Sequence, residues 1–187
     1  LLTSTSLHRP TPDPISIPRM PPPTPPTPPA TSVRIVRATP ADAPRLVPIF
    51  EAYRAFYGKP PAEEASLAFL SERLDRGESA VFLALAAPSN PCDEPAIVGF
   101  VQIYPTFSSV NLRRIWTLND LFVVEAYRRR GVARQLIAAA VALARETSAR
   151  SLALLTEETN TPAQALYESL GWTRDTVYRR YTLTIDA

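Results

Sequence analysis

The chain has little of the chemistry on which many enzyme sites depend. Among 187 residues it has one cysteine, Cys92, and one histidine, His8. A single cysteine cannot form an intrachain disulfide or a cysteine metal cluster. Because His8 lies in the first 30 residues, the remainder has no histidine for a catalytic triad, a cysteine–histidine pair or a metal site. A site in that remainder must therefore use carboxylates, tyrosines, backbone amides or a bound cofactor, and we expect no metal.

Long apolar runs and a strong charge bias are also absent. No run approaches the roughly 20 apolar residues that a membrane-spanning helix needs, so we expect a cytoplasmic protein with no membrane partner. The 20 basic and 18 acidic residues give a net charge of +2. That balance is too even for a dedicated nucleic-acid-binding module, so we expect no nucleic-acid partner.

Proline, in contrast, is abundant at one end of the chain. Of the 21 prolines, 11 fall within the first 30 residues, where leucine, isoleucine and methionine are only scattered. Such a stretch cannot bury enough apolar area to fold. We therefore predict a disordered Pro-rich tail over residues 1–31 and one folded domain over residues 32–187. The tail also suits a polyproline ligand for an aromatic groove, although its composition fits a disordered linker better.

Hydrophobic periodicity outlines the elements of the domain. Strands are predicted at 32–38, 79–86, 96–104, 116–124, 151–156, 172–176 and 178–185, and helices at 43–57, 61–77, 132–148 and 160–171. Residues 105–114 are predicted as a loop. The strand–helix–strand order over 116–156 implies a parallel crossover, while the strands at 79–86 and 96–104 imply an antiparallel pair. The predicted fold class is therefore mixed α/β (α+β) with a mixed sheet.

Side chains of the central strand 116–124 are predicted to alternate between two faces. One face is expected to carry Leu118, Phe122 and Val124, and the other Asn119, Leu121 and Val123. Asp120 is the charged residue of this apolar strand. An ionised carboxylate there costs free energy unless it is paired or hydrated, so we expect Asp120 either to face a cleft or to meet an arginine.

This strand continues through a basic turn into a helix that begins near Gly131. The first amides of a helix lack intrahelical partners and carry the positive end of its dipole, and a glycine lets an anion approach the backbone. Phosphate binding is therefore suggested for Arg128, Arg129, Arg130, Gly131, Val132, Ala133 and Arg134. Because short motifs often match by chance, a solvated basic turn and an arginine-rich nucleic-acid patch stay open as alternatives.

Tyr167 is a candidate general acid on the predicted helix 160–171. A tyrosine hydroxyl with a pKa of roughly 10 can donate a proton to a leaving thiolate, whose pKa is roughly 8.5. The alternative is a core tyrosine whose hydroxyl is hydrogen-bonded within the fold. Asn160 similarly fits a simple helix cap.

Three motifs taken together resemble the GNAT superfamily of acetyl-CoA-dependent N-acetyltransferases. They are the strand LNDLFVV, the helix segment NTPAQALYESLGW, and a loop that follows the family pattern Q/R-x-x-G-x-G/A at Arg128, Gly131 and Ala133. The resemblance covers residues 32–187 and implies a mixed, centrally splayed β-sheet flanked by helices. The strand is most similar to that of diamine-type acetyltransferases, which commonly reads LEDLFV. Asn119 stands in place of that glutamate, and an asparagine can hydrogen-bond an amine but cannot take its proton.

The resemblance also implies roles for individual residues. The loop amides from Arg129 to Arg134 would bind the pyrophosphate of acetyl-CoA, with Asn160 and Ala163 bordering the cofactor on the other side. The pantetheine arm would pair like an added strand with Leu121, Phe122 and Val123, and an amide of this region would polarise the thioester carbonyl. Tyr167 would protonate the departing thiolate. Water, Asp120 or a glutamate at the end of the next strand would take the proton of the amine.

The predicted function is acetyl transfer from acetyl-CoA to a primary amine of a small molecule by direct attack. A diamine, an amino acid or a similar compound would be the substrate, and the resemblance allows a homodimer. The alternative is an acyl-CoA-binding sensor without transferase activity. A nucleic-acid module built on residues 128–130 is the third hypothesis, and the near-neutral charge argues against it.

Overall fold

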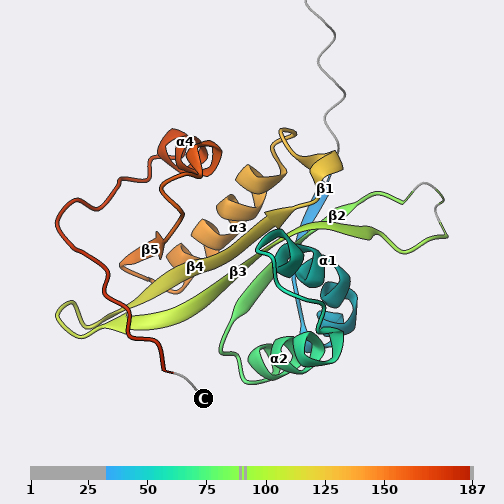
Figure 1. Cartoon of the computed structure of the whole chain (residues 1–187), viewed down its shortest axis with the longest axis horizontal. Helices are drawn as coiled ribbons and strands as arrows, with labels where there is room; N and C mark the ends of the chain where they lie inside the picture. The colour runs from blue at the N-terminus through green and yellow to red at the C-terminus, as the bar shows by residue number, and fades with distance from the viewer. Residues whose placement is uncertain (1–32, 89, 91, 186–187) are drawn as a thin grey trace, which may run out of the picture.

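The structure is a computed structural model that describes residues 33–88, 90 and 92–185. Five strands and four α-helices make up this part of the chain (Figure 1). In chain order they are β1 (Val33–Arg37), α1 (Ala43–Phe56), α2 (Glu63–Asp75), β2 (Ala80–Ala86), β3 (Ala96–Ser108), β4 (Arg113–Val123), α3 (Val132–Glu146), β5 (Ser151–Leu154) and α4 (Thr161–Ser169). The tail predicted over residues 1–31 lies outside the described residues.

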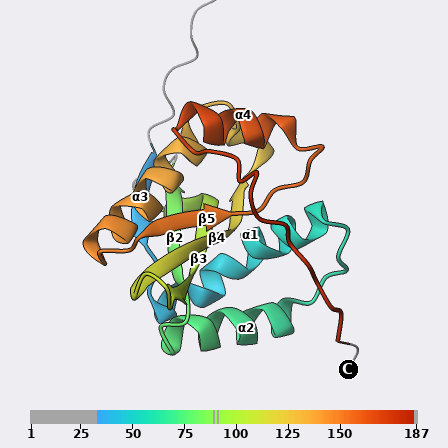
Figure 2. The ribbon, with the colours of Figure 1, turned by 90° about the vertical axis from the view of Figure 1, so that its left-hand side faces the viewer.

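The strands form one mixed sheet in the order β1-β2-β3-β4-β5. The first four strands pair antiparallel, and β4 pairs parallel with β5 through the crossover helix α3. Helix α3 packs on one face of the sheet, whereas α1 and α2 lie on the other face (Figure 2). The predicted fold class, a mixed α/β sheet flanked by helices, is therefore confirmed.

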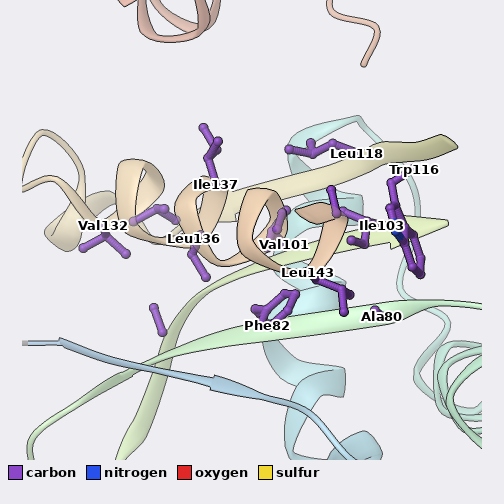
Figure 3. Packing of buried hydrophobic residues seen from close by; sticks show 14 of the residues in the cluster. Ala80, Phe82, Val101, Ile103, Trp116, Leu118, Val132, Leu136, Ile137 and Leu143 are labelled. Atoms are coloured by element: carbon purple, nitrogen blue, oxygen red, sulfur yellow. The ribbon is translucent and has the colours of Figure 1, made fainter. Parts of the chain in front are cut away.

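Two apolar clusters hold the layers together, one on each face of the sheet. The first lies between α3 and the sheet, where Leu136 and Leu143 meet Phe82 and Val101 (Figure 3). The second lies between α1, α2 and the sheet and includes Leu46 of α1. Successive β2 residues contribute to opposite clusters, and every β2 residue is buried. This explains the continuous apolar run of β2, because both faces of the strand are covered.

The prediction of simple alternation in the central strand is wrong. Across the β3–β4 ladder, Gln102 pairs with Asp120 while Ile103 pairs with Leu118, so Asn119 is an extra residue in β4. Such a β-bulge changes which residues share a face. Leu118 consequently joins the α3-side cluster, whereas Phe122 packs in the α1-side cluster.

Two other predicted boundaries are wrong. Residues 105–114 are not a loop, because β3 and β4 extend as a ladder to the pair of Ser108 and Arg113, leaving a turn at 109–112. The strands predicted at 172–176 and 178–185 are not formed, since no strand follows α4 among the described residues. Both errors involve pairing, which depends on a neighbouring strand as well as on the local sequence.

None of the helices in the described ranges is long and apolar enough to cross a membrane. The same ranges contain no group of three or more histidine, cysteine, aspartate or glutamate residues that could hold a metal ion.

Candidate active site

The strands β4 and β5 stay paired over only four residues each. Their ladder runs from the pair of Ile115 and Ser151 to the pair of Leu118 and Leu154, and it ends at the bulge. Beyond the bulge, β4 continues to Val123 and pairs only with β3 in the described part of the chain. One edge of the predicted cofactor-binding residues Leu121, Phe122 and Val123 is thus left without a strand partner. Such an edge can accept an extended ligand by backbone hydrogen bonds.

The open edge leads directly into the loop at the start of α3. Gly131 precedes the first residue of α3 and has a φ of +78°, and Arg129 has a φ of +56°. The Gln135 amide is bonded to the Gly131 carbonyl, so the amides before it belong to the unpartnered first turn of the helix. A Cβ added to Gly131 would meet nothing within 4 Å. The glycine therefore provides its backbone conformation and an open approach to the amides, both of which suit an anion.

Arginine side chains of this loop brace the neighbouring elements. Arg128 donates from Nε to the Val123 carbonyl over 2.9 Å, and its guanidinium lies 5.6 Å from the Phe122 ring centre. At the other end of the loop, Arg134 donates from Nη2 to Ser169 Oγ over 3.0 Å, which connects α3 with α4. Arg130 lies over the Tyr127 ring. These contacts fix the loop on both sides. The unpartnered amides of the first turn lie at the same end of α3.

Helix α4 places two of the predicted residues. Asn160 Oδ1 accepts a 3.3 Å hydrogen bond from the Ala163 amide, which is the cap expected from the sequence. Tyr167 is half-buried, and its ring centre lies 5.7 Å from that of Trp172. Burial raises the pKa of the Tyr167 phenol, with a further contribution from Tyr57 at the end of α1. Tyr167 is thus protonated at neutral pH and is chemically able to donate a proton.

The Asp120 carboxylate lies on the α1 side of the sheet and is almost fully buried, at 6% exposure. Its Oδ1 accepts a 2.7 Å hydrogen bond from the Tyr53 hydroxyl and a 3.0 Å hydrogen bond from Asn119 Nδ2. Burial raises the pKa of Asp120, and these two hydrogen bonds oppose the rise. Within the described residues no arginine forms an ion pair with Asp120. Its hydrogen-bond partners are a phenol and an amide. The expectation that Asp120 meets an arginine is therefore not met among the described residues.

Aromatic rings pack against Tyr53, the donor to this carboxylate, and one of them contacts Arg128 of the α3 loop. Tyr53 stacks edge-on with Tyr57 at 5.1 Å and with Phe122 at 6.1 Å between ring centres. The Arg128 guanidinium lies 5.9 Å from the ring centre of Phe56. Phe56 and Phe122 thus both lie close to the Arg128 cation.

Sequence analysis missed Tyr53, Tyr57 and Tyr104 as members of the site. Tyr53 lies within the helix predicted at 43–57, and its spacing to Phe56 and Tyr57 puts three aromatic residues on one helical face. That spacing was the available signal. Burial and the nearby Asp120 charge raise the pKa of Tyr104, so its phenol is also close to this carboxylate.

The residues with predicted roles come from three parts of the fold. Asn119, Asp120 and the open edge of β4 lie at the bulge, the loop and Gly131 follow directly, and Asn160 and Tyr167 come from α4. Of the glutamates after β5, Glu158 is exposed and pairs with Arg174 at 2.7 Å.

Comparisons with known proteins show which family and fold this chain resembles. The family model described as the acetyltransferase (GNAT) family matches residues 46–172. The chain is 38% identical over 155 residues to the uncharacterized N-acetyltransferase YhfO of Bacillus subtilis (strain 168), a match that covers 83% of this chain and 99% of that protein. A crystal structure of a probable acetyltransferase is 44% identical with a TM-score of 0.75, covering 82% of this chain and 99% of the other. Aminoglycoside N-acetyltransferase AAC(6')-Iy in complex with CoA, at 23% identity and a TM-score of 0.66 over 85% of this chain and 99% of that chain, shares the fold.

Proposed function

This chain belongs to the GNAT family of N-acetyltransferases, and we propose that it transfers the acetyl group of acetyl-CoA to a primary amine of a small molecule. The observation that carries the proposal is the unpartnered edge of β4 running directly into the start of α3. The edge suits the amide-bearing pantetheine arm, and the helix start suits the pyrophosphate. An acyl-CoA thioester combines both groups in one molecule.

The described residues fit acetyl-CoA by their chemistry. Amides from Arg129 to Arg134 would bind the pyrophosphate, aided by the left-handed backbone at Arg129 and Gly131. Residues Leu121, Phe122 and Val123 would pair with the pantetheine arm. A backbone amide near Phe122 would polarise the thioester carbonyl, because a fixed donor stabilises the negative charge that develops on that oxygen.

Asp120 is the group that we assign to accept the proton of the amine. Its raised pKa brings the carboxylate closer to the neutral range in which a general base works best. Asn119 donates to Asp120 and cannot itself accept that proton. The proton is passed through water or directly, and the neutral amine then attacks the acetyl carbon.

Tyr167 would act at the opposite end of the reaction. As the bond from nitrogen to carbon forms and the bond from carbon to sulfur breaks, the departing thiolate takes the Tyr167 proton. The resulting phenolate recovers a proton from solvent. Tyr167 of α4 and Asp120 of β4 are separate groups, so the acid and the base can each carry out one of the two proton transfers.

The rings of Tyr53, which donates to Asp120, and of its neighbour Tyr57 favour a cationic amine. A buried carboxylate without an arginine partner attracts an ammonium group, and the neighbouring rings can contact its methylene groups. Diamines and amino acids with a side-chain amine meet these requirements. Solved structures that share this fold include an aminoglycoside acetyltransferase in complex with sisomicin, so polycationic amines also belong in the test.

The experiment is a thiol-release assay with acetyl-CoA against polyamines, amino acids, aminoglycosides and N-terminal peptides. Turnover with one class and acetylated product by mass spectrometry are expected. Calorimetric binding of CoA without product from any amine would instead support the acyl-CoA-binding sensor. Failure to bind CoA at all would contradict the assignment of the α3 loop.

A further inference from the structure

Gln102 is a buried amide whose oxygen has no hydrogen-bond partner among the described residues. The residue lies within β3 and is 0% exposed, and its Nε2 donates a 3.0 Å hydrogen bond to Ser79 Oγ. A buried acceptor that is left unpaired costs free energy, so folds seldom keep one without a reason. The Oε1 atom of Gln102 is therefore available to a further donor.

Gln102 and Asp120 lie opposite each other in the β3–β4 ladder, where their Cα atoms are paired. Both side chains point to the α1 side of the sheet, because Phe100 and Phe122, two residues away along each strand, belong to the α1-side cluster. Residues directly opposite in an antiparallel pair have Cβ atoms roughly 4.5–5.5 Å apart. The side chain of Gln102 can therefore reach the Asp120 carboxyl group.

The two hydrogen bonds that Asp120 accepts both end on Oδ1, from the Tyr53 hydroxyl and from Asn119 Nδ2. Within the described residues Oδ2 accepts none, so a proton added to Oδ2 does not compete with these two donors. A protonated carboxyl group is itself a donor, and a buried donor needs an acceptor. Gln102 Oε1 is an acceptor of this kind on the same face of the sheet.

We propose that Gln102 is a positioning residue for the base, and that its Oε1 accepts a hydrogen bond from Asp120 Oδ2 once the carboxylate has taken the proton of the amine. This role rests on the proposed function of Asp120 as the base. An N–H bond of the substrate breaks, an O–H bond forms at Oδ2, and that O–H donates to Gln102 until the proton is released to solvent. Because Gln102 bonds only the protonated form, it makes Asp120 a stronger base.

The groups that face Asp120 from the neighbouring elements keep their charge while its carboxyl group titrates. Tyr53 of α1 and Tyr104 of β3 are the two phenols, and burial together with the Asp120 charge raises the pKa of both, so both stay protonated. Arg73 of α2 acts on Tyr104 and stays positively charged. Asp120 is therefore the group that titrates in this part of the site.

A titration of the Asp120 carboxyl group tests the role of Gln102. Gln102→Met removes the acceptor and keeps an unbranched side chain. Ile103→Met is the matched control, because the next residue along β3 is equally buried but faces the α3 side. Carbon-detected NMR follows the carboxyl signal, identified by its loss in Asp120→Asn, with no amine or CoA present.

Gln102→Met should increase the acid dissociation constant of the Asp120 carboxyl group by about fivefold, because one hydrogen bond to the protonated form is lost. Ile103→Met should leave the constant unchanged. Gln102→Leu also lacks the acceptor, so it should give the same increase and takes the place of Gln102→Met if that variant does not fold. In the active enzyme, the acidic limb of the kcat/KM profile should move to lower pH.

Three results would overturn the role of Gln102. An unchanged constant, or equal changes in Gln102→Met and Ile103→Met, would show that Oε1 does not bond the carboxyl group. A decreased constant would show that Gln102 donates to the carboxylate instead. Failure of the proposed transferase activity is a separate result, because the titration uses no substrate. An acidic limb that stays in place while the NMR titration moves would remove Asp120 as the base, and with it the catalytic role of Gln102.

Discussion

The Tyr53 hydroxyl donates a 2.7 Å hydrogen bond to Asp120 Oδ1, which joins the middle of α1 to the bulged part of β4. Both partners are remote in sequence, and the carboxylate between them is almost fully buried. The hydrogen bond stabilises the charged form of Asp120 and partly offsets the burial that raises its pKa. The affinity of this candidate base for protons therefore depends on a residue of the other layer.

Replacing Tyr53 by phenylalanine should shift the pH dependence of turnover. Tyr53→Phe keeps the ring contacts but removes the hydroxyl that lowers the pKa of Asp120. That pKa should rise further, so the acidic limb of the kcat/KM profile should move to higher pH. Loss of one hydrogen bond to a charged group should lower kcat/KM by about tenfold at pH values on the acidic limb. An unshifted limb, measured with the same amine, would show that Asp120 is not the titrating base.

Asp120→Asn should reduce activity and raise stability at neutral pH. The folded-state pKa of Asp120 is raised above its ordinary value of 3.8, so the folded state binds more protons than the unfolded state between these two values. By linkage, this contribution to stability is present below pH 3.8 and is lost as the pH rises through the folded-state pKa. An asparagine does not ionise, so the variant does not lose stability in this way as the pH rises.

The Asp120→Asn variant should therefore melt a few degrees higher at pH 7 and be no more stable than the unaltered chain below the ordinary aspartate pKa. Its kcat should fall by about 100-fold, since a carboxamide cannot accept the proton. Calorimetric melting across pH, together with steady-state kinetics, checks both effects. A lower melting temperature at pH 7 with full activity would contradict the assignment.

The bulge that shapes this region was not predictable from the sequence. The sequence pattern is the same whether or not the strand contains an extra residue, because the apolar and polar residues do not change. The apolar residues are Leu118, Leu121 and Val123, and the polar residue is Asp120. Only the pairing of Gln102 with Asp120 shows that Asn119 is extra. Register depends on the neighbouring strand, which local patterns do not encode.

Signals carried by a few adjacent residues were easier to interpret. Gly131 was predicted at a helix start, and the structure gives it a positive φ there. The helix cap that was the alternative role for Asn160 is formed, because its side chain accepts from the Ala163 amide. The Tyr53–Asp120 contact was missed because it joins two elements across 67 residues. Local patterns thus predicted the start of α3 and the cap of α4, whereas a contact between distant elements was missed.

Tyr167→Phe should lower kcat by about 100-fold while leaving the Kd for CoA nearly unchanged. The ring keeps its contact with Trp172, and only the proton donor is lost. A thioester whose thiol is more acidic than that of CoA should lose less activity, because its thiolate leaves without protonation. Tyr178→Phe removes a hydroxyl from an exposed tyrosine outside the site and serves as the control. Full turnover of Tyr167→Phe across the pH range would exclude Tyr167 as the acid.

Gly131 and Gly77 offer a matched pair for testing the cofactor loop. Gly131 has a φ of +78° and Gly77 a φ of +62°, and an added Cβ would meet nothing within 4 Å at either position. Alanine at each should therefore cost about 1 kcal/mol of unfolding free energy through backbone strain alone. Urea denaturation should give similar losses for Gly131→Ala and Gly77→Ala.

CoA binding should separate these two variants. Gly77 follows α2, whereas Gly131 precedes the first turn of α3. A methyl group at position 131 would occupy the open approach to the first amides of α3, and strain in the loop would displace those amides. Gly131→Ala should weaken CoA by about tenfold or more in calorimetric titration, which corresponds to the loss of about one hydrogen bond to a charged group. Gly77→Ala should bind CoA like the unaltered chain. Equal affinities of both variants would mean that the pyrophosphate does not approach the backbone at Gly131, and the site would have to be moved away from the start of α3.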